Sequence, residues 1–284
     1  MAAEEATLRA AAPGSWPGNV FETQVGHFWG ILETRPYMRN RYALVEAILK
    51  INTFKAVETA LSHIMDMLRL CRSDNMGVRS QAPALMLRLN KDQECYDFVK
   101  WWRTCDPAGN YDWGDTSLPY LNIKDADVFE PCDVFLGRYN DLGHTVALTL
   151  LKSRLLTNLQ SLQNTATLAS EELPQELIDL IRENVAGPLV LKRPDIIRSA
   201  DHQAHIANMR AQVLKLYKRV KEDNAHFWPA IINPGRHLTA RPDYHSSGSV
   251  EEMQITLAYS FASWVETPGA VDIIKTLESG LGST

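Results

Sequence analysis

Two histidines on one predicted helix are the residues best suited to metal chemistry. His202 and His205 stand three positions apart in a helical pattern, a spacing that puts both imidazoles on one helix face. A zinc site needs three or four such ligands, and Asp195 and Asp201 are the nearest candidates for the others. No clear third ligand emerges, and a polar helix face is the simpler interpretation. We therefore predict no metal site.

A second set of polar residues has the composition of a calcium-binding loop. Asp106, Asn110, Asp112 and Asp115 could all offer oxygen ligands. An EF-hand loop, however, has alternating ligands, a central glycine and a closing bidentate glutamate. The segment lacks this arrangement, so we predict no calcium site.

Motifs for nucleophilic catalysis are missing from the sequence. It contains no G-x-S-x-G, no H-E-x-x-H and no phosphate-cradling glycine loop. Cys132 and His144 could form a catalytic pair only if the fold brings them together. The alternative is that the four cysteines, which lack C-x-x-C spacing, are free and mostly buried thiols. We predict no cofactor and no catalytic residue.

An aromatic and basic set is the stronger functional candidate. It consists of Arg35, Tyr37, Arg39, Arg41, Asn75 and Arg79. Guanidinium groups bind carboxylates through two parallel hydrogen bonds, and tyrosine offers flat apolar contact. On the concave face of stacked helical hairpins, such side chains could hold an acidic or extended peptide. The alternative is internal: Asn75 and Arg79 fix a turn by bonding to carbonyl groups and to Asp74.

Composition restricts the partners and the location of the chain. Its 284 residues are 45% hydrophobic, enough for a sizeable core, and carry 34 acidic and 29 basic side chains. That balance gives no basic field for nucleic acid. No run reaches the roughly 18 to 20 apolar residues of a membrane span, and the start MAAEEATLRAAAPG is unlike a secretory signal. We expect an intracellular protein, cytoplasmic or alternatively nuclear, of unknown oligomeric state.

The functional residues must be positioned by helices. Prolines and glycines at positions 13 to 18 predict a flexible tail over residues 1–20, followed by a single helical domain over 21–284. Apolar residues recur at steps of three and four from Arg35 to Thr104, with breaks near Asn52, Asn75 and Asn90. This pattern predicts two helical hairpins over about 35–104.

Beyond the hairpins, a long irregular segment interrupts the helical pattern. Residues 106–141 are rich in aspartate and aromatic side chains, which favours a loop that packs as a cover on the domain. The helical period returns afterwards and predicts further helices over 142–278. The predicted fold class is all-α.

Particular runs of residues resemble a known family. They are HFWGILETRPYMRNRYALVEAILKI, DMLRLCRSDNMGVRSQAPALMLRLNKDQECYDFVKW and, at the C-terminal end, DYHSSGSVEEMQITLAYSFASWVETPGAVDII. They resemble a tetratricopeptide-like family that includes the suppressor of tumorigenicity 7 proteins and bacterial and fungal proteins. Some fungal members add a MYND-type zinc finger, whose cysteine and histidine array this chain lacks.

The turn between the hairpins carries much of this likeness. The family joins its hairpins by RLNPNDN-G-R, and here Asp74, Asn75, Gly77 and Arg79 match while Arg72 stands at the proline position. The likeness covers roughly residues 28–105 and 243–275. It implies a repeat fold and an interaction role, and it implies no catalytic residues.

Two functions follow as hypotheses. The first is a protein-interaction adaptor that binds a peptide or protein partner through tetratricopeptide-like hairpins. The second is a small-ligand-binding protein or enzyme with a pocket under the 107–141 loop, in which His144, Asp133 and Tyr139 converge.

Overall fold

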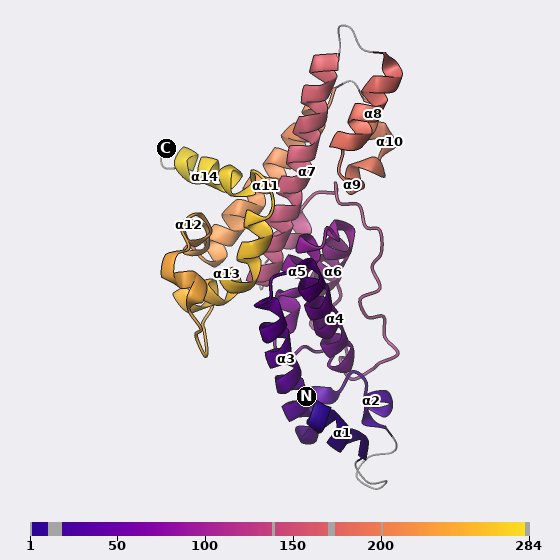
Figure 1. The fold of residues 1–284 in the computed structure, drawn as a ribbon, viewed down its shortest axis with the longest axis vertical. Helices are drawn as coiled ribbons and strands as arrows, with labels where there is room; N and C mark the ends of the chain where they lie inside the picture. Colours follow the sequence, from indigo (N-terminus) through magenta and orange to yellow (C-terminus); the bar gives the residue numbers. More distant parts are fainter. Residues whose placement is uncertain (1, 11–18, 138–139, 170–173, 200, 282–284) are drawn as a thin grey trace.

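The structure, a computed structural model, describes residues 2–10, 19–137, 140–169, 174–199 and 201–281. Within these ranges the ordered elements are helices, no strand is present, and one isolated bridge joins His27 to Cys71. The predicted all-α class is therefore confirmed. Figure 1 shows an elongated molecule built along one long helix, α7 (Leu142–Ala169).

The N-terminal residues are helical where the sequence predicts a tail. The alanine-rich run forms α1 (Ala2–Ala10), as expected from the high helix propensity of alanine. A second short helix, α2 (Val20–Thr23), is capped by Asn19, whose side chain accepts a hydrogen bond from the Phe21 amide at 3.1 Å. Leu8 of α1 is buried, and the Arg9 guanidinium lies 4.5 Å from the centre of the Phe21 ring.

Two helical hairpins occupy residues 35–104. The first joins α3 (Arg35–Leu49) to α4 (Phe54–Leu70), and the second joins α5 (Ala82–Arg88) to α6 (Asp92–Thr104). Both tight turns contain an asparagine with positive φ, Asn52 at 53° and Asn90 at 56°, a conformation that asparagine tolerates better than most residues. Two 3-10 turns, η1 (Phe28–Gly30) and η2 (Leu32–Thr34), precede α3, and η3 (Val78–Ser80) precedes α5.

The remaining helices contact α7 directly or pack on helices that do. They are α8 (Gln175–Val185), α9 (Pro188–Leu191), α10 (Pro194–Ile197), α11 (Gln203–Asp223), α12 (Phe227–Ile232), η5 (Gly235–Thr239), α13 (Val250–Val265) and α14 (Ala270–Leu281). Helix α7 contacts α5, α6, α8, α11, α13 and α14, which explains why its apolar residues are not confined to one face. It thus connects the hairpins to the C-terminal helices.

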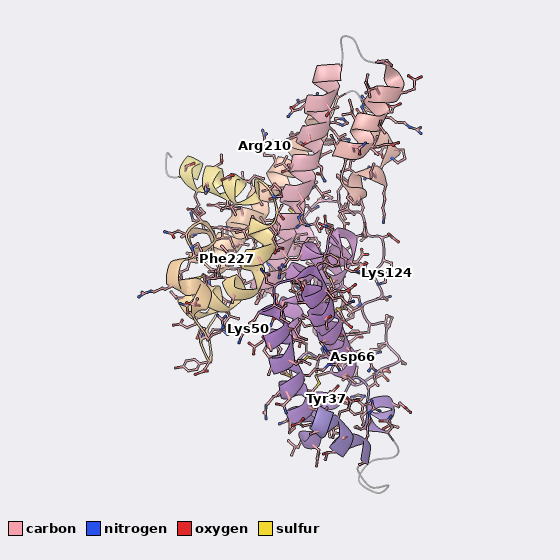
Figure 2. The ribbon with its side chains drawn as sticks, in the orientation of Figure 1. Tyr37, Lys50, Asp66, Lys124, Arg210 and Phe227 are labelled. Carbon is pink, nitrogen blue, oxygen red and sulfur yellow. The ribbon has the colours of Figure 1, made fainter. Side chains whose placement is uncertain are left out.

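The C-terminal helices have an aromatic core of their own. Trp228 stacks on Tyr217 with ring centres 5.5 Å apart, and its edge meets Trp264 at 5.4 Å. The Trp228 indole donates a hydrogen bond of 2.9 Å to the Tyr217 carbonyl, which satisfies its buried polar atom. Figure 2 shows the neighbouring Phe227 on this side of the molecule, away from Tyr37 at the hairpin end. No helix in the described ranges is both long and apolar enough to span a membrane.

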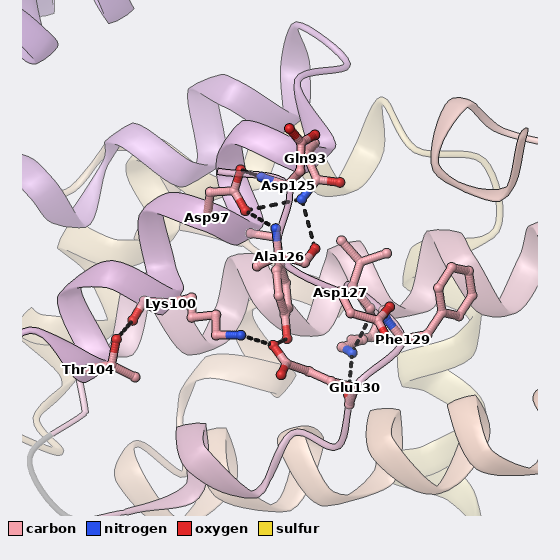
Figure 3. A network of polar contacts seen from close by, with 12 residues as sticks. Gln93, Asp97, Lys100, Thr104, Asp125, Ala126, Asp127, Phe129 and Glu130 are labelled. Carbon is pink, nitrogen blue, oxygen red and sulfur yellow. Dashed lines mark hydrogen bonds and ion pairs between the residues drawn. The ribbon is translucent and has the colours of Figure 1, made fainter. Parts of the chain in front are cut away.

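The irregular segment between α6 and α7 runs along the hairpins as an extended chain with one 3-10 turn, η4 (Asp133–Leu136). Its central part, residues 121–132, is here called the strap. Figure 3 shows how α6 holds it: the buried Asp97 carboxylate accepts hydrogen bonds of 2.9 Å from the backbone amides of Asp125 and Ala126. The Glu130 carboxylate in turn accepts from Lys100 at 2.5 Å and from the Tyr96 hydroxyl at 2.7 Å.

A buried lysine of α7 holds the strap from the other side. The Lys152 ammonium donates hydrogen bonds to the Val128 carbonyl at 2.5 Å and to the Glu130 carbonyl at 3.2 Å. Its side chain is fully buried, and this burial lowers the pKa of Lys152 to about 8. The strap is therefore fixed by charged side chains of two helices that bond to its backbone.

Candidate functional site

The predicted partner-binding residues fall into separate groups. Arg35 and Arg39 lie beside the Trp29 ring, with their guanidinium carbons 5.2 and 5.6 Å from its centre. Arg35 also donates a hydrogen bond of 2.9 Å to the Trp29 carbonyl. Arg39 is exposed. This group lies at the start of α3.

Tyr37 and Arg41 are buried and face the interior of the first hairpin. Arg41 donates hydrogen bonds to the Tyr37 hydroxyl at 3.0 Å and to His63 Nδ1 at 3.2 Å, and it forms an ion pair with Asp66. Burial, together with the Arg41 charge, lowers the pKa of His63. Figure 2 shows Tyr37 and Asp66 in the same region of the hairpin end. Arg41 and Tyr37 therefore join α3 to α4 within the first hairpin.

Asn75 and Arg79 both lie in the turn before α5, but they make different contacts. Asn75 is exposed and accepts a hydrogen bond of 2.7 Å from the Ser73 hydroxyl. Asp74, not Asn75, fixes the turn: its buried carboxylate accepts from the amides of Val78 and Arg79 at 3.0 and 2.8 Å. Burial raises the pKa of Asp74 to about 6 in spite of these bonds. Of the six predicted residues, only Arg79 lines a pocket of about 740 Å³.

This pocket lies where the hairpins, the long loop and the C-terminal segment meet, and we call it the junction pocket. Its volume is 740 Å³. It is lined by residues within 76–81, 99–106, 140–148 and 243–259, together with Tyr42, Trp113 and Phe135. The two ends of the 106–141 loop thus contribute to its wall, whereas the strap does not.

A buried polar cluster forms the α7 side of the junction pocket. Asp141 precedes α7 and accepts a hydrogen bond of 3.2 Å from the His144 amide, as an N-capping aspartate does. Its carboxylate also accepts from the Ser80 hydroxyl at 2.6 Å and lies 3.7 Å from Arg79 Nε. Burial alone would raise the pKa of Asp141, but the hydrogen bonds from the Ser80 hydroxyl and the His144 amide, together with the charge of Arg79, lower that pKa. Asp141 is therefore an ionised structural group.

His144 belongs to the same cluster, and its Nε2 atom is engaged in a hydrogen bond. Its Nε2 atom lies 3.1 Å from the Arg79 carbonyl, and its ring meets the Phe98 ring edge to face at 5.7 Å. Burial lowers the pKa of His144, so the imidazole is neutral at physiological pH. These contacts tie α7 to the hairpin turn.

Aromatic rings form another part of the wall. Trp102 and Trp113 stack with an interplanar angle of 18° and ring centres 5.6 Å apart. The Arg79 guanidinium lies 4.6 Å from the centre of the Trp102 ring, a cation–π contact. The junction pocket therefore combines flat apolar surface with charged groups.

Two buried polar groups that line this pocket have no hydrogen-bond partner among the described residues. They are the side-chain amide of Asn140, at both its oxygen and its nitrogen, and the indole Nε1 of Trp102. Buried donors and acceptors are nearly always paired in proteins, because leaving one unpaired costs about 1–3 kcal/mol. The hydrogen-bonding capacity of these three atoms is therefore unused within the described residues.

The residues predicted for an enzymatic pocket do not assemble here. Asp133 is exposed and pairs with Lys215 at 2.8 Å, outside the junction pocket, and Tyr139 lies outside the described residues. Cys132 is directed at the Gln212 carbonyl, 3.9 Å away, whereas His144 bonds to Arg79. The thiol that does line the pocket is Cys105, and burial raises its pKa to about 11, so it is protonated at physiological pH.

The two histidines singled out by the sequence, His202 and His205, differ in how far they are buried. His202 is fully buried, and neither ring nitrogen has a hydrogen-bond partner in the described part of the chain, while His205 is partly exposed. Burial lowers the pKa of His202. The described residues contain no group of three or more His, Cys, Asp or Glu side chains that could hold a metal ion.

Sequence reasoning missed Asn140, Asp141 and Trp102 as parts of one site. Asp141 carries a usable signal, since an aspartate just before a helical run predicts an N-cap. Asn140 has no such signal, because its role depends on where the loop ends in space.

Comparisons with known proteins add no relative to this description. No protein-family model, no curated protein and no solved structure matches the chain.

Proposed function

We propose that the chain is a protein-interaction module that binds an extended segment of a partner in the junction pocket. The observation that supports this proposal is that the Asn140 amide and the Trp102 indole, both unpartnered among the described residues, line one pocket. A primary amide side chain can donate to a peptide carbonyl and accept from a peptide N–H at once, and an indole N–H can donate to a further carbonyl. An extended peptide offers these groups along its backbone in any sequence.

The tetratricopeptide-like resemblance in the sequence also supports a role in protein interaction. The hairpins that carry the resemblance supply Arg79, Trp102 and the turn before α5 to the junction pocket. In helical-repeat proteins, the surface formed by stacked hairpins is the usual binding face. The binding surface proposed here differs from the one that the sequence suggests, because Arg41 and Tyr37 are engaged inside the first hairpin.

A second candidate, the binding of a small molecule, is favoured by the size of the pocket. Its 740 Å³ lies within the range of about 300–1,000 Å³ that is typical of small-ligand sites. Catalysis has less support, since the pocket thiol Cys105 is protonated and His144 bonds to a carbonyl through Nε2. The peptide hypothesis is preferred because it accounts for both polar groups.

The test is a selection from a library of short random linear peptides on the full chain. Affinities of selected peptides are then measured by fluorescence anisotropy for the wild type, Asn140→Ala and Trp102→Phe. Because each lost hydrogen bond costs about 0.5–1.5 kcal/mol, Asn140→Ala should weaken binding about tenfold and Trp102→Phe about threefold or more. Circular dichroism and urea unfolding establish that both variants are folded.

The matched control is Asn184→Ala, which removes an exposed amide on α8 that bonds only to the Leu180 carbonyl of its own helix. It should leave the affinity unchanged. Failure to select any peptide, or equal binding by all four proteins, refutes the proposed function.

A further inference from the structure

We propose that the partner segment carries a basic side chain, lysine or arginine, and that this side chain enters the junction pocket. This inference rests on the proposed function and adds the chemical class of the ligand. It is carried by the charges and rings of the pocket lining. The sequence pattern alone had suggested the opposite, an acidic segment held by arginines.

The lining carries more negative than positive charge. It contains four carboxylates, Asp106, Asp141, Asp243 and Glu252, and two guanidinium groups, Arg79 and Arg103. The buried His144 adds no positive charge, because burial keeps it neutral. An anionic ligand would therefore meet a net excess of two negative charges, whereas a cation would be attracted by it.

The positive groups of the lining are already engaged. Arg79 lies 3.7 Å from the Asp141 carboxylate and against the Trp102 ring. Arg103 donates from Nε to the Val134 carbonyl at 2.6 Å. Each guanidinium group thus has a partner within the chain, and the Asp141 carboxylate offsets the charge of Arg79.

Three carboxylates, by contrast, have no cationic partner in the described residues. Asp243 is exposed and makes no hydrogen bond or ion pair there. Glu252 accepts from the Asn224 side-chain amide at 3.0 Å and from the Gly248 amide at 2.7 Å, both neutral donors. Asp106 accepts from the amides of Asn110 and Tyr111 at 2.6 and 2.9 Å. A basic ligand would therefore not have to displace a cationic side chain of the described residues from any of these carboxylates.

Aromatic rings complete a site that suits a cation with an apolar stem. The lining includes Trp102, Trp113, Tyr42 and Tyr259. Such rings attract ammonium and guanidinium groups through their faces and pack against the methylene groups of lysine or arginine. The contact between Arg79 and Trp102 is an internal example of this mode.

The test uses a peptide that the library selection provides, made in three versions. The version with its lysine or arginine is compared with versions that carry glutamine or glutamate at that position. The inference predicts that selected peptides share a basic residue, that glutamine weakens binding about fivefold and that glutamate weakens it more than about tenfold.

A variant of the protein tests the electrostatic part separately. Asp243→Asn removes an exposed charge that has no structural partner, so it leaves the fold intact. It should weaken the lysine peptide about two- to fivefold and leave the glutamine peptide unchanged. The matched control is Asp272→Asn on α14, whose carboxylate pairs with Lys275 outside the pocket. This control should change neither affinity.

The two proposals fail in different ways. Peptides that need Asn140 and Trp102 but bind equally well with glutamine or glutamate overturn the inference and leave the proposed function standing. The absence of any peptide whose binding depends on Asn140 overturns the proposed function itself. A loss that is the same for Asp272→Asn and Asp243→Asn also overturns the inference, because it reflects overall charge and not the pocket.

Discussion

Replacing Asp97 by alanine should detach the strap from α6 without unfolding the helices. The Asp97 carboxylate is buried and accepts hydrogen bonds from the amides of Asp125 and Ala126, each at 2.9 Å, and from Gln93 Nε2 at 3.1 Å. Hydrogen bonds to a charged group contribute about 1.5–3 kcal/mol each. The two backbone bonds therefore amount to about 3–6 kcal/mol before the freed amides are rehydrated.

Rehydration reduces that cost, since Asp125 is exposed and Ala126 only half-buried. We expect a net loss of about 3 kcal/mol in the free energy of opening the strap, which is about a hundredfold faster amide exchange. Hydrogen–deuterium exchange with mass spectrometry on peptides covering 121–132 measures it. The free energy of unfolding in urea, followed by helical circular dichroism, should fall by no more than this amount, because the same bonds are lost when the chain unfolds.

The control for this experiment is Glu94→Ala on the same helix. Glu94 is exposed and pairs with Lys91 at the surface, an interaction that contributes less than about 1 kcal/mol. Strap exchange in Glu94→Ala should equal that of the wild type. Exchange in Asp97→Ala that stays within about threefold of this control would refute the argument that the carboxylate holds the strap.

Three further predictions concern α7 and the turn before α5. The pKa of Lys152 is lowered to about 8 in the fold, so above that pH the unfolded chain binds more protons than the folded chain. In urea unfolding, the stability of the wild type relative to Lys152→Met should therefore rise by about 3 kcal/mol between about pH 8 and 10.5. A difference in stability that does not change with pH would contradict this. The pKa of Asp74 is raised to about 6, so the contribution of this side chain to stability is present below about pH 4 and is lost as the pH rises through 6. The stability of the wild type relative to Asp74→Asn should fall by up to about 3 kcal/mol between pH 4 and pH 6. A difference in stability that stays the same over this range would count against the argument from burial. In Gly143→Ala the new Cβ would lie 2.6 Å from the Ser80 carbonyl oxygen and 2.5 Å from the Tyr259 hydroxyl. Thermal unfolding should therefore show that the free energy of unfolding falls by about 1–3 kcal/mol. Wild-type stability in this variant would show that the neighbouring atoms move aside without cost.

The helical part of the fold could be predicted because it follows from local periodicity. Apolar residues at steps of three and four identify the helices of both hairpins, and the asparagines at positions 52 and 90 mark their turns. The long helix α7 was predicted from the return of that period after residue 141. The N-terminal helix α1 was not, because the prolines and glycines after it suggested a tail and the burial of Leu8 depends on distant residues.

The candidate site could be predicted only in part, because it is assembled from segments far apart in the chain. The sequence drew attention to Arg79, which does line the junction pocket. It could not show that Arg41 is satisfied by His63 and Asp66 on the neighbouring helix. Nor could it show that Asn140 and Trp102 line one pocket, since no local pattern encodes the approach of two distant segments.

The central claim, that a peptide binds in the junction pocket, is tested most directly by the indole N–H resonance of Trp102. The sequence has seven tryptophans, and the missing signal in Trp102→Phe assigns this one in a two-dimensional nitrogen–proton spectrum. Addition of a selected peptide should shift the Trp102 signal downfield, because its Nε1 has no partner among the described residues and gains a carbonyl. The Trp228 indole, already bonded to the Tyr217 carbonyl, should not move. A Trp102 signal that stays in place at saturating peptide would contradict the account.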